Sequence, residues 1–360
     1  MRLGYFAMPS HPASRCVTDT LNEDRQAIIL ADKLGYYDAF IGEHLTDLVE
    51  NVTNSMMFLA TLIHSTENIK LATGTTNLAH HHPVMVAAHA AMFDHLSRGR
   101  FILGVSAGAI PSDYEVLGID IAQQKHIFAE ALDVILSIWK SDPPYNIQNN
   151  RFKVSTMKTI DDVSNVGKMY KPYQYPRPEI VGTVVEPHSK GAVAMGEKSI
   201  HPLSANFVID DFLSSHWNSY KFGQHSVGVV ADRNDWRIAR TIFVNEDDKV
   251  AREYGKDSLQ SPYRLYYKNL LHKLLKGRKP TFLKNEGDTS PVVFDDVIDK
   301  LIICGSVNKV VDDILYLNEK VNGFGELVYA GIDWADPMLS QKSMKLMAEQ
   351  VMPRVRDALK

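Results

Sequence analysis

Two apolar runs in the first third of the chain end in side chains that can do chemistry. Residues 37–41 lead to His44, and residues 101–105 lead to Ser106 and Gly108. An imidazole can act as an acid, a base or a hydrogen-bond donor, and glycine lets backbone approach a flat ligand. Because the carboxyl ends of parallel strands carry the sites of α/β proteins, this pattern indicates an enzyme. The alternative for His44 is an ordinary histidine of a surface loop.

Ser106 has more than one interpretation. Residues 104–108 read Gly-Val-Ser-Ala-Gly, which matches the elbow of serine hydrolases, where the serine is a nucleophile. That elbow leads straight into a helix, whereas residues 110–113 are expected to prolong the loop. Ser106 is alternatively a hydrogen-bond donor or a filler, and the match is weak support for a hydrolase.

The run His80, His81 and His82 invites a metal site. Adjacent side chains of an extended segment point to opposite faces, and the spacing places no carboxylate beside them. We therefore expect no metal. One of the three is expected to face a pocket, with the others solvated or capping the helix that begins at Pro83. A metal-dependent barrel hydrolase rests on this run alone.

His188, Ser189, Lys190 and Gly191 join a predicted strand to a predicted helix rich in small residues. The exposed amides of a helix start, a serine hydroxyl and a lysine charge suit a phosphate group. The alternative is an ordinary serine N-cap, although a lysine at a helix N-terminus opposes the helix dipole unless an anion is bound. The sequence thus offers an anion site at residues 188–191.

The elements that position these residues repeat along the chain as apolar runs followed by amphipathic stretches. Such repeats with short connections predict a parallel sheet, because each right-handed crossover places the next strand beside the last. Eight strands are expected, at residues 3–7, 39–41, 69–73, 101–105, 179–184, 203–207, 237–244 and 325–332. Helices are expected at residues 21–34, 55–65, 83–96, 122–139, 189–197, 211–222, from 249 onward, 308–320 and 340–356.

Closure of this sheet predicts an α/β fold of the (β/α)8 TIM-barrel class, with residues 1–360 as a single domain. Two insertions interrupt the repeat. Residues 140–178 are rich in Pro, Asn, Tyr and Lys with little periodicity, which predicts an excursion between barrel units. Residues 258–295 carry several tyrosines and lysines and are expected to form a helical lid or a dimer element.

The composition excludes several functional classes. The 360 residues are 45% hydrophobic and 23% charged with a net charge of −4, so we expect a globular protein that binds small molecules and not nucleic acid. Cys16 and Cys304 are too far apart in sequence to form a disulfide framework, which favours a reduced, cytoplasmic setting. The chain start lacks the apolar core of a signal peptide, and no later stretch is long enough to span a bilayer.

Taken together, the chain resembles the bacterial luciferase-like family of flavin-dependent monooxygenases, most of all its diketocamphane and limonene monooxygenases. The resemblance covers nearly the entire chain. It implies a barrel that binds FMN, reduced by a separate reductase, and adds O2 to form a flavin hydroperoxide that oxygenates a small apolar carbonyl or related compound. The motifs that carry it are residues 34–37 leading to 42–44, 73–75 leading to 82–83, 96–101 leading to 104, 178–180, 194–198 and 351–353.

The resemblance also implies roles for single residues. His44 matches the active-site histidine of the family, and residues 74–75 fall where members have a cis peptide that does not precede proline. Ser106 falls where luciferase has a reactive cysteine, and Ala107 replaces an arginine found there in luciferase, so the phosphate contacts are assigned to residues 188–191. The expected FMN-binding residues are Gly74, Thr75, Ser106, Gly108, His188, Ser189, Lys190 and Gly191.

The same family analogy implies a homodimer through the second and third helices. Three alternatives to the monooxygenase stay open. One is a deazaflavin-dependent oxidoreductase, which would share the barrel and the cis peptide but transfer hydride without oxygen chemistry. The others are a flavin-binding protein without catalysis and the metal-dependent barrel hydrolase.

Overall fold

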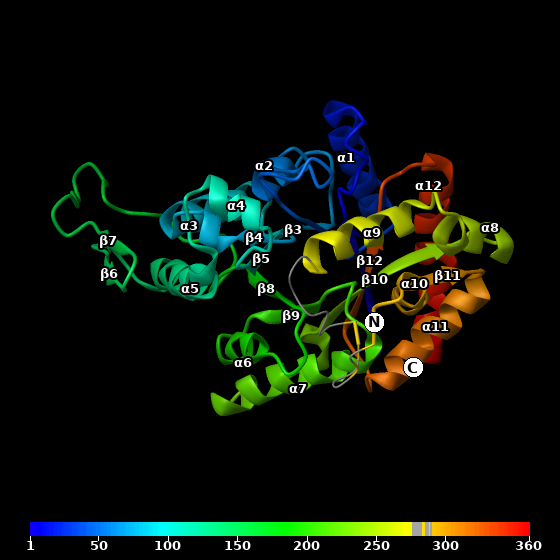
Figure 1. The fold of residues 1–360 in the computed structure, drawn as a ribbon. Coiled ribbons are helices and arrows are strands. Elements are labelled where there is room, and N and C mark those ends of the chain that lie inside the picture. Colours follow the sequence, from blue (N-terminus) through cyan, green and yellow to red (C-terminus); the bar gives the residue numbers. More distant parts are fainter. Residues whose placement is uncertain (276–282, 285–287, 289) are drawn as a thin grey trace.

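The computed structural model describes residues 1–275, 283–284, 288 and 290–360 (Figure 1). Within this part of the chain, eight parallel strands close into a ring, because β10 pairs with β12 on one side and with β9 on the other. The predicted (β/α)8 TIM-barrel fold is thereby confirmed. In ring order the strands are β1 (Arg2–Ala7), β2 (Asp38–Ile41), β3 (Lys70–Thr73), β5 (Phe101–Ser106), β8 (Glu179–Val184), β9 (His201–Ser204), β10 (Arg237–Val244) and β12 (Glu326–Gly331).

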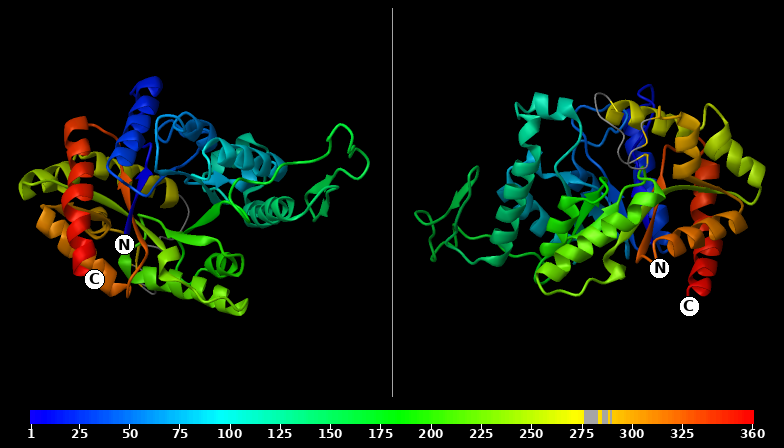
Figure 2. Two further views of the ribbon diagram at one scale, coloured as in Figure 1. Left: turned by 180° about the vertical axis from the view of Figure 1, so that it is seen from behind. Right: turned by 60° about the horizontal axis from the view of Figure 1, so that its bottom comes forward.

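Helices follow the strands and cover the outside of the barrel (Figure 2). Their ends obey local rules: Pro83 occupies the first turn of α3, and Nδ1 of His82 accepts the N–H of Val84. The helices are α1 (Val17–Lys33), α2 (Ser55–Ala60), α3 (Pro83–Leu96), α4 (Pro111–Val116), α5 (Gln124–Lys140), α6 (Lys190–Glu197), α7 (Asp210–Ser226), α8 (Asp248–Arg252), α9 (Pro262–Leu275), α10 (Phe294–Leu301), α11 (Val307–Lys320), α12 (Pro337–Leu346) and α13 (Met352–Ala358).

Several expected elements differ from the observed ones. The expectation that residues 110–113 prolong a loop is wrong, because α4 begins at Pro111, where proline suits the first helical turn. In the barrel sheet, two short strands, β4 (Thr76–Asn77) and β11 (Ile302–Gly305), were not expected. The latter pairs with the second half of β10 after β10 has left β9. The last helix is divided, since the π-helical turn Met347–Val351 joins α12 to α13.

Side chains fill the barrel interior. At its amino-terminal end lies a buried ion cluster, in which Arg237 contacts Asp38, Glu179 and Glu326. Because the barrel is packed, a ligand has room only above the carboxyl ends of the strands. The apolar layer above the ion cluster consists of Phe6, Phe40, Ala72, Ile102, Val181, Leu203, Ala239 and Val328.

The two expected insertions have different structures. Residues 141–178 contain the antiparallel pair β6 (Asn146–Gln148) and β7 (Lys153–Ser155) and extend away from the barrel beyond α5 (Figures 1 and 2). The second insertion contains α9, and its residues 276–282, 285–287 and 289 lie outside the described part of the chain. In the part that the structure describes, no helix is both long and apolar enough to cross a bilayer.

Candidate active site

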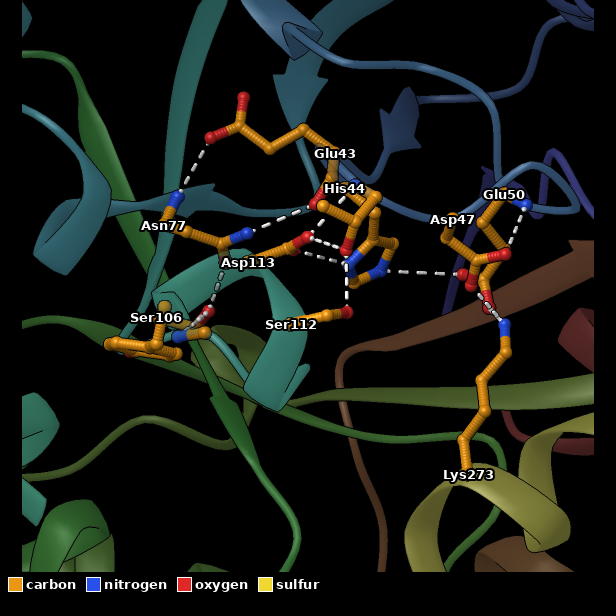
Figure 3. Close-up of polar contacts among 12 residues, drawn as sticks. Glu43, His44, Asp47, Glu50, Asn77, Ser106, Ser112, Asp113 and Lys273 are labelled. Atoms are coloured by element: carbon orange, nitrogen blue, oxygen red, sulfur yellow. Dashed lines mark hydrogen bonds and ion pairs between the residues drawn. The ribbon is translucent and has the colours of Figure 1, made fainter. Parts of the chain in front are cut away.

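His44 lies between two carboxylates just beyond the end of β2 (Figure 3). Its Nε2 is 3.5 Å from Oε2 of Glu50, and its Nδ1 is 3.6 Å from Oδ2 of Asp113. The His44 side chain is 20% exposed, whereas that of Asp113 is fully buried. A ligand at the barrel mouth can therefore reach the imidazole but not the carboxylate of Asp113.

The two carboxylates keep His44 positively charged. Burial by itself lowers the pKa of the imidazole, but Asp113 and Glu50 raise that pKa to about 10. Burial raises the pKa of the two carboxyl groups, but contacts dominated by His44 bring the pKa of each down to about 2. At neutral pH His44 is thus an imidazolium, which can donate a hydrogen bond or a proton but cannot act as a base.

Asp113 was missed by the sequence reasoning. It stands in the first turn of α4, where its Oδ1 accepts hydrogen bonds from the backbone N–H and the hydroxyl of Thr46, at 2.9 and 2.6 Å. These bonds tie α4 to the loop that carries His44. The available signal was an acidic residue in the first turn of a helix that starts with proline shortly after a strand.

Glu43 points away from His44 and connects three other elements. Its Oε2 accepts hydrogen bonds from the backbone N–H and the hydroxyl of Ser55, at 3.0 and 2.7 Å. Its Oε1 accepts the backbone N–H of Asn77 at 2.9 Å and lies 3.0 Å from Nε2 of His81. Burial raises its pKa, but His81 and these N–H groups lower it overall. Glu43 is a buried anchor for the loops around the site.

Ser106 belongs to a hydroxyl network beside a cis peptide. The bond between Gly74 and Thr75 is cis, as the family resemblance implied. The hydroxyl of Thr75 donates to Ser106 Oγ at 2.6 Å, and Ser106 donates to Oδ1 of Asn77 at 2.8 Å. No imidazole contacts Ser106 Oγ among the described residues, which removes the base that a serine nucleophile needs.

Two of the candidate glycines are required for packing. A Cβ on Gly74 would lie 2.9 Å from atoms of Phe6 and Phe40, which form the barrel core. Gly108 has a φ of +91°, and a Cβ there would lie 2.9 Å from Nε2 of His80. Steric crowding and, at Gly108, the positive φ therefore account for glycine at both positions without a bound ligand.

The three adjacent histidines have different partners. His81 contacts Glu43, His82 caps α3, and the ring of His80 packs edge-on against Tyr114 with centroids 4.7 Å apart. They line a cavity of about 300 Å³ together with Glu43, Asn54, Met56, Thr76, Met85, Val86 and His89. Because the three side chains diverge to separate partners, this arrangement gives no support to a shared metal.

A different trio of metal-ligand type lies elsewhere in the described chain. The potential ligand atoms of His11, Glu23 and Asp333 lie within 4.8 Å of one another. Arg15 already contacts both carboxylates, and Nδ1 of His11 is 2.5 Å from Asp333. The arrangement is that of a buried ion network in which a cation is already present.

The expected anion site lies between β8 and α6. Ser189 Oγ accepts the N–H of Ala192 at 3.2 Å, so the serine is an N-cap, as the alternative interpretation predicted. His188 has a φ of +51°, and its N–H donates to Ser215 Oγ at 3.1 Å. Lys190 and Gly191 are exposed in the first turn of α6. The backbone N–H groups of these two residues lie in the first turn of the helix. They and the lysine charge can bind an anion.

Helix α9 belongs to the insertion at residues 258–295, for which a helical lid or a dimer element is expected from the sequence. The hydroxyl of Tyr267 is 2.9 Å from Oγ1 of Thr241 on β10 and donates to the carbonyl of Asn206 at 3.0 Å. Near the other end of the helix, Lys273 contacts Asp47 and Glu50 on the loop after β2 (Figure 3). Both contacts are with the carboxyl-end side of the barrel, where His44 lies.

Two curated relatives align with almost the whole chain. The 4-hydroxyprotoasukamycin monooxygenase of Streptomyces nodosus subsp. asukaensis is 31% identical and covers 99% of this chain and 92% of its own length. The limonene 1,2-monooxygenase of Rhodococcus erythropolis is 29% identical, with 97% of this chain and 85% of its own length covered.

Solved structures share the fold. The oxygenating constituent of 3,6-diketocamphane monooxygenase from Pseudomonas putida, in complex with FMN, superposes with a TM-score of 0.86 at 24% identity, covering 99% and 98% of the two chains. An F420-dependent secondary alcohol dehydrogenase gives a TM-score of 0.71 at 18% identity and 99% coverage of both chains. The family model described as luciferase-like monooxygenase matches residues 1–321. This chain therefore belongs to the luciferase-like monooxygenase family.

Proposed function

We propose that the protein is the oxygenase of a two-component, FMN-dependent monooxygenase that acts on a small apolar carbonyl or related compound. In this reaction one atom of O2 enters the substrate and the other leaves as water. The observation that carries the proposal is the position of His44 between Asp113 and Glu50 at the barrel mouth, which raises the pKa of the imidazole to about 10. Oxygen insertion places negative charge on oxygen, which an imidazolium stabilises.

The residues at the mouth fit FMN. Exposed Lys190 and the first N–H groups of α6 suit its phosphate, while Thr75 and Ser106 offer hydroxyl groups beside the cis peptide. When bound and reduced, FMN would supply the two electrons that the reaction needs. The structure of the 3,6-diketocamphane monooxygenase constituent in complex with FMN adds support from a relative.

His44 is proposed to hold a proton for the reaction. Nδ1 and Nε2 of His44 both face carboxylates. Because these carboxylates favour the charged imidazole, the ring takes up a new proton after it has donated one. The imidazolium orients oxygen of the substrate and donates to the oxyanion that develops there. Because its pKa is about 10, this donor stays charged throughout the neutral range.

We place the contact between two copies of the chain on α2 and α3, as the family analogy implies. Met57, Met85, Met92 and Leu96 are large apolar residues exposed on these two helices. Met57 is 72% exposed, although its neighbours Phe58 and Leu59 are buried in the core. Because α2 and α3 contact each other, the exposed methionine and leucine side chains on these helices support a docking surface for a second copy.

The proposed substrate class and partner rest on the relatives. Two of them are named for limonene and diketocamphane, which supports a small organic substrate. Another is described as the oxygenase component of a flavin-dependent trigonelline monooxygenase, which supports a separate reductase as the partner. The deazaflavin alternative rests on a structural neighbour at 18% identity, whereas the relatives named as monooxygenases are 24–31% identical to this chain.

Labelled oxygen tests the proposal. The protein, a flavin reductase, NADH and FMN are incubated under ¹⁸O2 with limonene or a cyclic ketone, and the products are analysed by mass spectrometry. The expected result is one ¹⁸O atom per product molecule, formed only when reductase and protein are both present. The proposal is overturned if the whole panel yields only hydrogen peroxide at the rate of free reduced FMN. Anaerobic reduction of a ketone by reduced F420 would instead establish the deazaflavin alternative.

A further inference from the structure

Helix α9 contacts the barrel mouth at two separate places. Through Tyr267 it is fixed to Thr241 of β10 and to Asn206, which follows β9. Through Lys273 it is fixed to the loop after β2. The step from Tyr267 to Lys273 spans roughly 9 Å along a helix, at about 1.5 Å per residue. The helix therefore connects strands that are not adjacent in the ring, since β12 and β1 lie between β10 and β2.

The second contact ends on the carboxylate that holds His44. Lys273 Nζ is 2.9 Å from Oε1 of Glu50, while the other oxygen, Oε2, is 3.5 Å from Nε2 of His44. Lys273 also contacts Asp47, whose Oδ1 accepts the N–H groups of Val49 and Glu50 at 2.9 and 3.3 Å. One ammonium group thus fixes the carboxylates of Asp47 and Glu50, and Glu50 divides its two oxygens between α9 and His44 (Figure 3).

We propose that Lys273 is a positioning residue: it holds Glu50 against His44 and thereby joins α9 to the reactive end of the barrel as one closed unit. The inference deepens the proposed function and rests on the role assigned there to His44. Lys273 reaches the imidazole only through Glu50, so it is not itself a catalytic residue.

Two effects of removing Lys273 have opposite signs at His44. Loss of a nearby positive charge, with everything else in place, favours the imidazolium and raises the pKa of His44 further. Loss of positioning lets Glu50 turn away from His44, and the loss of this negative charge lowers the pKa of His44 toward its ordinary value near 6.5. The direction of the change therefore distinguishes a positioning role from a purely electrostatic one.

The other charged or titratable groups around His44 are fixed by different elements. Asp113 faces it from α4, and His80 faces the same cluster from the 3-10 turn Leu78–His80. From α9, Tyr266 interacts electrostatically with Glu50, and Lys273 forms an ion pair with Glu50. Because Asp113 stays bound to Thr46, a substitution at Lys273 leaves this side of the imidazole unchanged.

The experiment measures the pKa of His44 by NMR in ¹⁵N-histidine-labelled protein, with the signal assigned from a His44→Gln variant. Lys273→Met is expected to lower the pKa of His44 by about one unit or more, because the negative charge of Glu50 moves away from the imidazole. Lys273→Arg, which keeps the charge and the hydrogen bonds, is expected to restore the wild-type value. Lys268→Met is the matched control, because Lys268 is an exposed lysine of the same helix.

A pKa that rises in Lys273→Met, or that does not move, overturns the positioning role. If that variant does not fold, Lys273→Gln, which keeps a hydrogen-bond donor without the charge, is measured in its place with the same two outcomes.

The titration needs neither cofactor nor substrate, so it is independent of the proposed function. A second readout, the fraction of reduced FMN that yields product, is expected to fall in Lys273→Met. If the wild type makes no product while the pKa shift is seen, the proposed function fails and the positioning role stands.

Discussion

Oδ2 of Asp113 faces Nδ1 of His44 at 3.6 Å, and neither atom has a hydrogen-bond partner among the described residues. Charge attraction acts over this distance, but it is longer than a hydrogen bond. The contact therefore favours the charged form of the imidazole. Because both atoms are buried, a ligand can reach the ring only at its exposed part. Geometry and charge together make His44 the central residue of the candidate site.

Replacement of His44 by Gln should leave FMN binding near the wild-type value and reduce coupled oxygenation roughly 10²- to 10⁴-fold, the usual cost of a lost proton-transfer group. Product and hydrogen peroxide are quantified in the same reaction, and peroxide should increase as product falls. His225→Gln, at an exposed position at the end of α7, serves as the control. Unchanged coupling in the His44 variant would contradict the proton-donor role.

Asp113→Asn should lower the pKa of His44, because the substitution removes one of the two adjacent negative charges while an oxygen can still accept from Thr46. The upper pH limit of coupled oxygenation should then move to lower pH. The pH–rate profile is compared with that of Glu115→Gln, an exposed position on the same helix. A profile like that of the control would show that Asp113 does not set the charge of His44.

The free energy of unfolding should decrease as the pH rises above neutrality. The folded-state pKa of His44 is raised to about 10 and that of His11 to about 9, from an ordinary value of 6.5. A raised pKa contributes stability that is complete below about pH 6.5 and is lost as the pH rises through the folded value. Urea titrations across this range should show a steeper decrease for the wild type than for His44→Gln. Parallel curves would mean that His44 is not charged in the folded protein.

Substitution of Lys190 by Gln should weaken FMN binding about tenfold, the loss of one charge-assisted contact, and leave riboflavin binding almost unchanged. The difference arises because only FMN carries the phosphate. Dissociation constants for both ligands are measured by fluorescence quenching, with Lys221→Gln, an exposed lysine of α7, as the control. Equal weakening of both ligands would exclude a phosphate contact.

Met85→Lys should convert a dimer into monomers, because it places a charge in the apolar surface proposed on α2 and α3. The molar mass is measured by sedimentation velocity. Met338→Lys, at a methionine of α12 that is 81% exposed, should behave as the wild type. A wild-type protein that is already monomeric at micromolar concentration would contradict the proposed contact.

The sequence allowed the barrel to be predicted because the pattern that defines it is local. Each apolar run, followed by an amphipathic stretch, produces one strand and one helix, and the right-handed crossover rule assembles them. The strand β11 was missed because it pairs only with the second half of β10, a contact with no signature in its own short sequence. The loop expected at residues 110–113 was wrong because α4 has little more than one turn to show periodicity.

The sequence by itself determined the fold, the position of His44 behind a strand and the family to which the chain belongs. Only the tertiary structure decided the charge of that histidine, because Asp113 and Glu50 reach it from different loops and a pKa depends on distance and burial rather than on residue type. The same holds for Lys273, which the fold brings to Glu50 from a helix more than two hundred residues later in the chain. Local patterns specify strands and helices, whereas the electrostatics of a site arise from contacts that exist only after the ring has closed.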